Sequence, residues 1–178
     1  MNLRHILIAA LLVISAPAFA AEISVDYSYT GNHRTDFSNL RVSLAVSDVT
    51  DDRGGEPNLI AEGYSADMPL TDIIRDALIQ GFEHGGAELA TEDSEMQVAG
   101  RILSSQLRTV DRSGVESLQL TIRTNVTLQG SGRTIWETTL FARGTVPVDE
   151  GIVPALHAAM DRMVRELVSD DYFLIEIQ

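Results

Sequence analysis

The sequence has 178 residues, of which 44% are hydrophobic and 22% are charged, and it contains no cysteine. This length and apolar content suffice for one globular core and exclude a disordered or collagen-like chain, and the lack of cysteine excludes disulfides and thiolate metal sites. The 13 basic residues, all arginine, are outnumbered by 26 acidic ones. The formal charge of −13 argues against a chain built to bind nucleic-acid phosphates or anionic lipid.

Residues 1–20 have the pattern of an export signal. Arg4 supplies a positive charge, and residues 6–14 form an unbroken apolar run. Ala18 and Ala20 place small side chains at the −3 and −1 positions before a cleavage position at Ala21. The run is shorter than the roughly 20 residues that span a bilayer. We therefore expect a signal peptide at 1–20 and a single periplasmic domain at 21–178, with a formal charge of −14, whose association with a membrane is only indirect.

The first part of this domain alternates with the period of β-strands. Residues 22–29 and 40–48 place apolar side chains at every second position. Residues 48–57 concentrate acidic residues, glycine and proline, which predicts an exposed turn, and a short strand is expected near residues 58–64. The simplest arrangement of the strands on the two sides of this turn is a hairpin.

Two amphipathic helices are predicted farther along the chain. The first covers residues 70–82 and ends at Gly85-Gly86, and Gly81 on its apolar stripe predicts a close approach by another element. The second covers residues 152–167, and the short apolar segment at 172–177 should pack back onto the domain.

Between the two helices the period is again two. Strands are expected at about residues 95–110, 116–129 and 133–143, joined by glycine-containing turns into an antiparallel meander. The order β-β-β-α-β-β-β-α predicts one α+β domain. We expect its antiparallel or mixed sheet of about five or six strands to carry the two helices on one face.

No residue pattern of a catalytic or metal site is found. The histidines of the mature chain, His33, His84 and His157, lie far apart in the sequence and lack the spacing of zinc or iron ligands. No serine lies in a nucleophile elbow, and Trp136 alternates along a strand as a core residue would. We therefore predict no enzyme activity, no cofactor and no metal site.

The candidate surface site is the acidic turn, which we define as Asp48, Asp51, Asp52, Arg53 and Glu56. It fails the template of an EF-hand calcium loop, because Arg53 occupies the position that needs glycine and Leu59 the position that needs glutamate. A looser oxygen-ligand cation site is one interpretation. The other is a solvated turn in which Arg53 neutralises part of the charge.

Several short motifs resemble the YajG-type family of bacterial envelope lipoproteins. They are residues 46–53 (VSDVTDDR), residues 59–63 (LIAEG), and the helix from residue 70 to 82 with its terminal glycines. The resemblance covers about residues 40–170 and implies an α+β envelope domain without established enzymatic activity. The outline is also similar to auxiliary lipoproteins of envelope ABC transport systems. This chain departs from the family because it lacks the cysteine that carries the lipid.

These observations favour an exported, non-catalytic binding or assembly module that acts through protein–protein contacts. Its partner would be another envelope protein or a second copy, bound for example at a sheet edge such as residues 22–29. The alternatives are a carrier of a small ligand, held behind Ile73, Leu78, Leu156 and Met160, and an unrecognised hydrolase.

Overall fold

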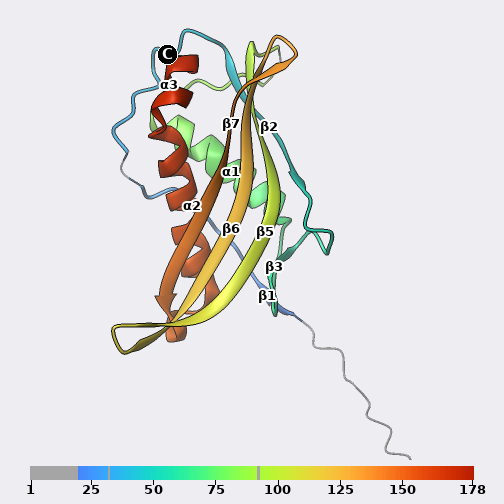
Figure 1. The fold of residues 1–178 in the computed structure, drawn as a ribbon, viewed down its shortest axis with the longest axis vertical. Coiled ribbons are helices and arrows are strands. Elements are labelled where there is room, and N and C mark those ends of the chain that lie inside the picture. The colour runs from blue at the N-terminus through green and yellow to red at the C-terminus, as the bar shows by residue number, and fades with distance from the viewer. Residues whose placement is uncertain (1–19, 32, 92) are drawn as a thin grey trace, which may run out of the picture.

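Four strands form the central sheet of the structure (Figure 1). In spatial order they are β2 (Leu44–Asp51), β5 (Met96–Arg112), β6 (Val115–Gly130) and β7 (Arg133–Pro147). The last three form an antiparallel meander, and β2 lies parallel to β5 at one edge of the sheet. The predicted α+β class, the mixed sheet and the meander are confirmed.

The computed structural model describes residues 20–31, 33–91 and 93–178. The predicted signal peptide at 1–20 therefore lies, except for Ala20, outside the described residues.

The meander owes its register to two short turns. Ser113-Gly114 and Ser131-Gly132 have positive φ at both residues, 56° and 83° in the first turn and 52° and 74° in the second. Two consecutive residues with positive φ are typical of the type I′ turn, whose twist matches that of the strands it joins. Glycine at the second position accommodates this conformation without strain.

A second, smaller sheet holds the remaining strands in the order β1-β4-β3. β1 (Ala21–Ile23) is parallel to β4 (Tyr64–Ala66), which is antiparallel to β3 (Leu59–Ala61). The expected hairpin between residues 40–48 and 58–64 is therefore wrong. β2 passes through an irregularity between Val46 and Val49 and continues to Asp51 along β5, whereas Gly63, with φ of 84°, turns the later segment into a hairpin of its own.

The predicted strand at 22–29 is also wrong beyond Ile23. Residues 24–31 form no ladder and instead run as an extended strap over the helices. Val25 and Tyr29 are buried there, which explains why the sequence alternates like a strand. The backbone N–H of Tyr29 donates to Gln80 Oε1 at 2.7 Å, and Gln80 Nε2 donates to the Tyr27 carbonyl at 3.2 Å. A side chain thus satisfies the groups that a neighbouring strand would have satisfied.

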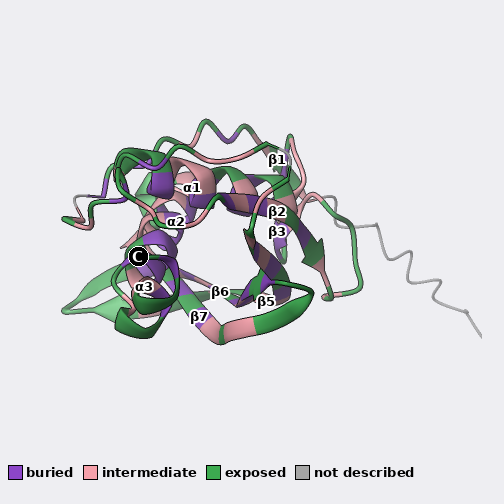
Figure 2. Ribbon diagram, turned by 90° about the horizontal axis from the view of Figure 1, so that it is seen from above, coloured by how far each residue is buried: buried purple, intermediate pink, exposed green. Residues whose placement is uncertain are grey.

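The two long helices cover one face of the central sheet (Figure 2). They are α1 (Leu70–His84) and α2 (Ile152–Val168), which follows the 3₁₀ turn η1 (Val148–Glu150). A third helix, α3 (Asp171–Ile177), is capped by Asp170, whose side chain accepts the Phe173 N–H at 2.8 Å. Phe173 and Ile177 are buried, so the apolar end of the chain packs back as expected.

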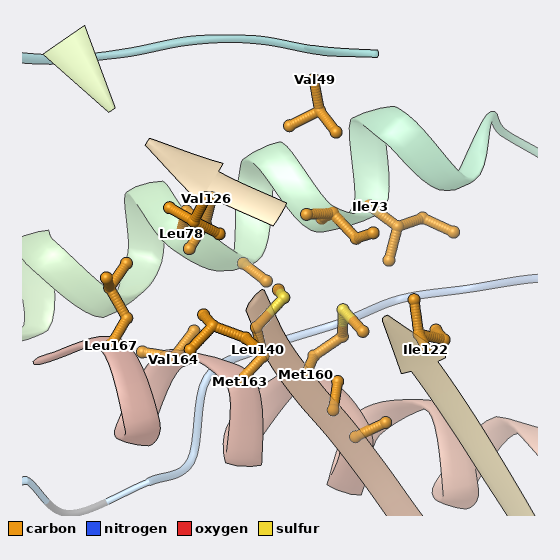
Figure 3. Close-up of a cluster of buried hydrophobic side chains, with 14 of the residues drawn as sticks. Val49, Ile73, Leu78, Ile122, Val126, Leu140, Met160, Met163, Val164 and Leu167 are labelled. Atoms are coloured by element: carbon orange, nitrogen blue, oxygen red, sulfur yellow. The ribbon is translucent and has the colours of Figure 1, made fainter. Parts of the chain in front are cut away.

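Apolar side chains fill the layer between the helices and the sheet (Figure 3). Leu78 of α1, Met160 of α2 and Val126 of β6 are at most 1% exposed. Gly81 permits the helices to meet, because a Cβ atom there would overlap Cγ1 of Val164. This confirms the close approach predicted from the sequence. Gly144 plays the same part between β7 and α2, because a Cβ atom there would overlap the backbone carbonyl of Ala155.

Gly144→Ala should lower the free energy of unfolding by at least about 2 kcal/mol, because the new methyl group meets helix backbone that cannot rotate away. The measurement is equilibrium urea denaturation. Gly55→Ala is the matched control, since a Cβ atom there has no neighbour within 4 Å, and it should change stability by less than about 0.5 kcal/mol. Equal stability of the two variants would contradict the close packing of β7 on α2.

Ile74→Asp should destabilise the domain by more than about 4 kcal/mol, because Ile74 is fully buried and the aspartate would be an unpaired charge in the core. Ile175→Asp, at a position that is 72% exposed, should cost less than about 1 kcal/mol. Thermal unfolding followed by circular dichroism compares the two. An unchanged midpoint for the Ile74 variant would show that the orientation of α1 is wrong.

Candidate functional site

The side chains of the acidic turn do not point to one common site. Asp48 lies at the irregularity of β2, with its side chain 97% exposed, and its carboxylate is 3.7 Å from Nε of Arg75 on α1. Asp52 approaches Nη1 of Arg101 on β5 at 3.1 Å. The aspartates therefore face arginines on different elements, so the turn is an array of separate ion pairs.

Arg53 organises the buried part of this turn. Its Nε donates to both carboxylate oxygens of Asp51, at 2.9 and 3.1 Å, and its Nη2 donates to Oδ2 at 2.6 Å. Nη1 donates to the carbonyl of Leu59 at 2.6 Å, which ties the end of β2 to β3. The guanidinium thus joins the two sheets, and the Arg53 side chain is only 13% exposed.

The same contacts set the charge state of Asp51. Hydrogen bonds from the Arg53 side chain hold the pKa of the Asp51 carboxyl below its ordinary value, against the opposing effect of partial burial. A lowered pKa in the folded state means that the ionised carboxylate stabilises the fold above the unfolded pKa of about 4. This contribution is lost as the pH falls through the lowered pKa of the folded state.

The turn borders a groove, but its side chains are not grouped as metal ligands would be. The groove has a volume of about 330 Å³ and is lined by residues that include Arg53, Glu56, Leu59 and Gln106. The part of the chain that the structure describes contains no group of three His, Asp or Glu side chains placed to hold a metal ion. The role of the acidic turn as a surface site stays a prediction, and its visible contacts are those of a structural network.

The fold brings together two histidines that are far apart in the sequence. The rings of His33, which lies beyond the strap, and His84, at the end of α1, have centroids 5.4 Å apart, and Tyr29 lies against both. Nε2–H of His33 donates to the carbonyl of Gly81 at 3.0 Å.

Asp161 on α2 holds the neighbouring part of the strap. Its carboxylate accepts hydrogen bonds from the hydroxyls of Tyr27 and Thr30, both at 2.8 Å. Burial, together with the Asp161 carboxylate, raises the pKa of Tyr27. These contacts fasten the strap across α1 and α2.

The uncovered face of the sheet carries a set of residues that the sequence analysis missed. We call it the outer face and define it by four rows of paired residues across β5, β6 and β7: Arg108-Gln119-Thr145, Gln106-Thr121-Arg143, Ser104-Arg123-Phe141 and Arg101-Asn125-Thr139. Every row contains one arginine and none contains an acidic residue. Alternation places these arginines on the wet side of their strands, but only the register shows that they occupy consecutive rows.

Fold and surface together define a class: an α+β domain with a helix-covered sheet whose other face is polar and carries arginine. No family model matches the chain, and no curated protein matches it.

Solved structures with a similar fold come from bacteria. Protein XCC0632 from Xanthomonas campestris, of the family DUF330, is 19% identical with a TM-score of 0.65, over 84% of this chain and 93% of that protein. A minor lipoprotein from Acinetobacter baumannii is 12% identical with a TM-score of 0.45, over 80% and 96% of the two chains. A PelC dodecamer from Paraburkholderia phytofirmans is 12% identical with a TM-score of 0.43, over 79% and 91%.

The first of these likenesses shows the fold that this chain shares with a DUF330 protein. The particular YajG-type family stays a prediction.

Arg53→Ala should destabilise the domain by about 2–3 kcal/mol, because it removes charge-assisted hydrogen bonds from a side chain that is mostly buried. Arg162→Ala is the control, because Arg162 makes an exposed i,i+4 pair with Glu166 and should cost about 0.5 kcal/mol or less. Urea denaturation at pH 7 measures both losses. Indistinguishable losses would mean that the acidic turn is only a solvated loop.

Proposed function

We propose that this chain is an exported, non-catalytic protein of the bacterial cell envelope that acts as a binding or assembly module through protein–protein contacts. In this proposal residues 1–20 are a signal peptide and residues 21–178 form the periplasmic domain. The fold shared with a DUF330 protein and the lipoprotein-like neighbours are compatible with an envelope protein. Among the described residues, no helix combines the length and apolarity needed to cross a bilayer.

The observation that carries the proposal is the uncovered outer face. The helices pack on one side of the central sheet, and no described element lies against the opposite side (Figures 1 and 2). Phe141, on the edge strand β7, is 46% exposed on this side, and the side chains around it are mostly polar. A broad polar face with an exposed aromatic residue is a surface that a protein partner can cover.

The helix-covered side of the sheet gives less support to the alternative function, a carrier of a small ligand. The four residues behind which a ligand was expected, Ile73, Leu78, Leu156 and Met160, are at most 2% exposed and belong to one hydrophobic core. The groove described at Ile73 has a volume of about 160 Å³ and is also lined by Asp26, Asp76 and Gln80. A drug-sized ligand needs a pocket of roughly 300 Å³ or more.

Photo-crosslinking in living cells tests the proposed module. Benzoylphenylalanine at Gln106 or Gln129, both exposed on the uncovered side of the sheet, should crosslink to a discrete partner, which is another envelope protein or a second copy. The same group at Ile175, which is 72% exposed on α3, is the control and should give no discrete product. Equal product patterns from the two sides, or none from either, would refute the proposal.

A further inference from the structure

The arginines of the outer face form a regular series that we call the arginine ladder: Arg108, Arg143, Arg123 and Arg101. They occupy four consecutive rows, whose β6 members are residues 119, 121, 123 and 125. Outward positions on a strand repeat every second residue, so neighbouring rows are about 6.8 Å apart. The ladder therefore spans about 20 Å along the sheet.

The ladder is a positive strip on an acidic protein. Its four rows hold four arginines and no acidic residue, whereas the whole chain has 26 acidic residues against 13 basic ones. Within the described ranges, Arg101 pairs with Asp52, but the other three arginines make no ion pair. All three are exposed. Arg108 donates to the Gln106 side chain at 3.1 Å, and the guanidinium of Arg123 lies 5.2 Å from the ring centroid of Phe141.

Acidic residues border part of the strip. Glu137 lies in the row beyond Arg101, where Asp52 also approaches. Beside the strip, Glu56 and Glu62 line the same groove as Ser104 and Gln106. The row beyond Arg108, Val110-Ser117-Pro147, carries no charge. An occupant of matching charge must therefore be narrow and follow the ladder for about 20 Å. A flat anionic membrane would bring its charge against these acidic borders as well, within the Debye length of about 8 Å at physiological salt.

We propose that the arginine ladder binds an extended acidic segment of a partner protein, with Asp or Glu at every second position. Alternate side chains of an extended chain are also about 6.8 Å apart, so consecutive carboxylates match the spacing of the rows. A segment that runs over β6, the strand between β5 and β7, lies within one strand spacing, about 4.8 Å, of the strand that carries each arginine. The planar guanidinium group suits paired hydrogen bonds to carboxylate. The Gln, Asn, Ser and Thr side chains between the arginines can bind the backbone of the segment. This inference rests on the proposed function, since it names the partner chemistry of the same face.

Fluorescence anisotropy with two labelled peptides of equal composition tests the inference. The peptide (Glu-Thr)₄ presents a carboxylate at every second residue, whereas Glu₄-Thr₄ clusters the same charges at one end. The purified protein should bind the alternating peptide at least tenfold more tightly at an ionic strength of 0.15 M. Equal affinity for the two peptides, or no binding of either, would overturn the inference.

Matched double variants identify the surface. Arg123→Gln/Arg143→Gln should weaken binding of (Glu-Thr)₄ at least tenfold, while Arg34→Gln/Arg162→Gln, which changes the net charge equally, should alter it less than twofold. Circular dichroism checks that both variants fold. Equal losses would mean that only net charge matters, and would overturn the inference.

Two further outcomes would assign the face to another occupant and so overturn the inference. One is tighter, arginine-dependent binding to vesicles of phosphatidylglycerol and phosphatidylcholine. The other is self-association that the Arg123/Arg143 variant abolishes without any peptide binding. If crosslinks from Gln106 persist while the peptides fail to bind, the proposed module stands and only the acidic segment is refuted.

Discussion

The structure depends on the close contact between one face of the central sheet and the two long helices. Gly144 brings β7 against the backbone of α2, and Gly81 brings α1 against Val164 of the same helix. Together these contacts close an apolar layer in which side chains such as Ile74 and Leu156 are fully buried. Because all the covering helices lie on this side, the hydrophobic core uses one face of the sheet and leaves the other to solvent.

This one-sided packing determines which charged side chains the uncovered face of the sheet carries. The core face of β6 carries Leu120, Ile122 and Val126, so its arginine must point to the outer side. The acidic residues are spread over loops, helices and strand ends, and Asp51 and Asp52 have arginine partners of their own. An acidic protein thereby presents one positive strip, and that contrast favours a specific anionic partner over general attraction to polyanions.

The sequence predicted those elements whose patterns are local. The stripe from Leu70 to Phe82 and the glycine turns of the meander are fixed by neighbours in the chain, and they form as expected. Alternation at 22–29 was misread, because an extended strap over two helices buries every second residue as a strand does. The partner of β2 and the rows of the outer face depend on pairing between distant segments. A single sequence therefore shows that Arg101, Arg123 and Arg143 are exposed, but not that they are neighbours.

Arginine reactivity in cells tests the central claim most directly, because it asks whether the uncovered face is covered in its natural setting. Phenylglyoxal, read out by mass spectrometry, should modify Arg123 and Arg143 readily in the purified protein and much less in intact cells. Arg162, on the outer side of α2, should react equally in both. If Arg123 and Arg143 react as fast in cells as in the purified protein, the outer face has no stable occupant and the account is wrong.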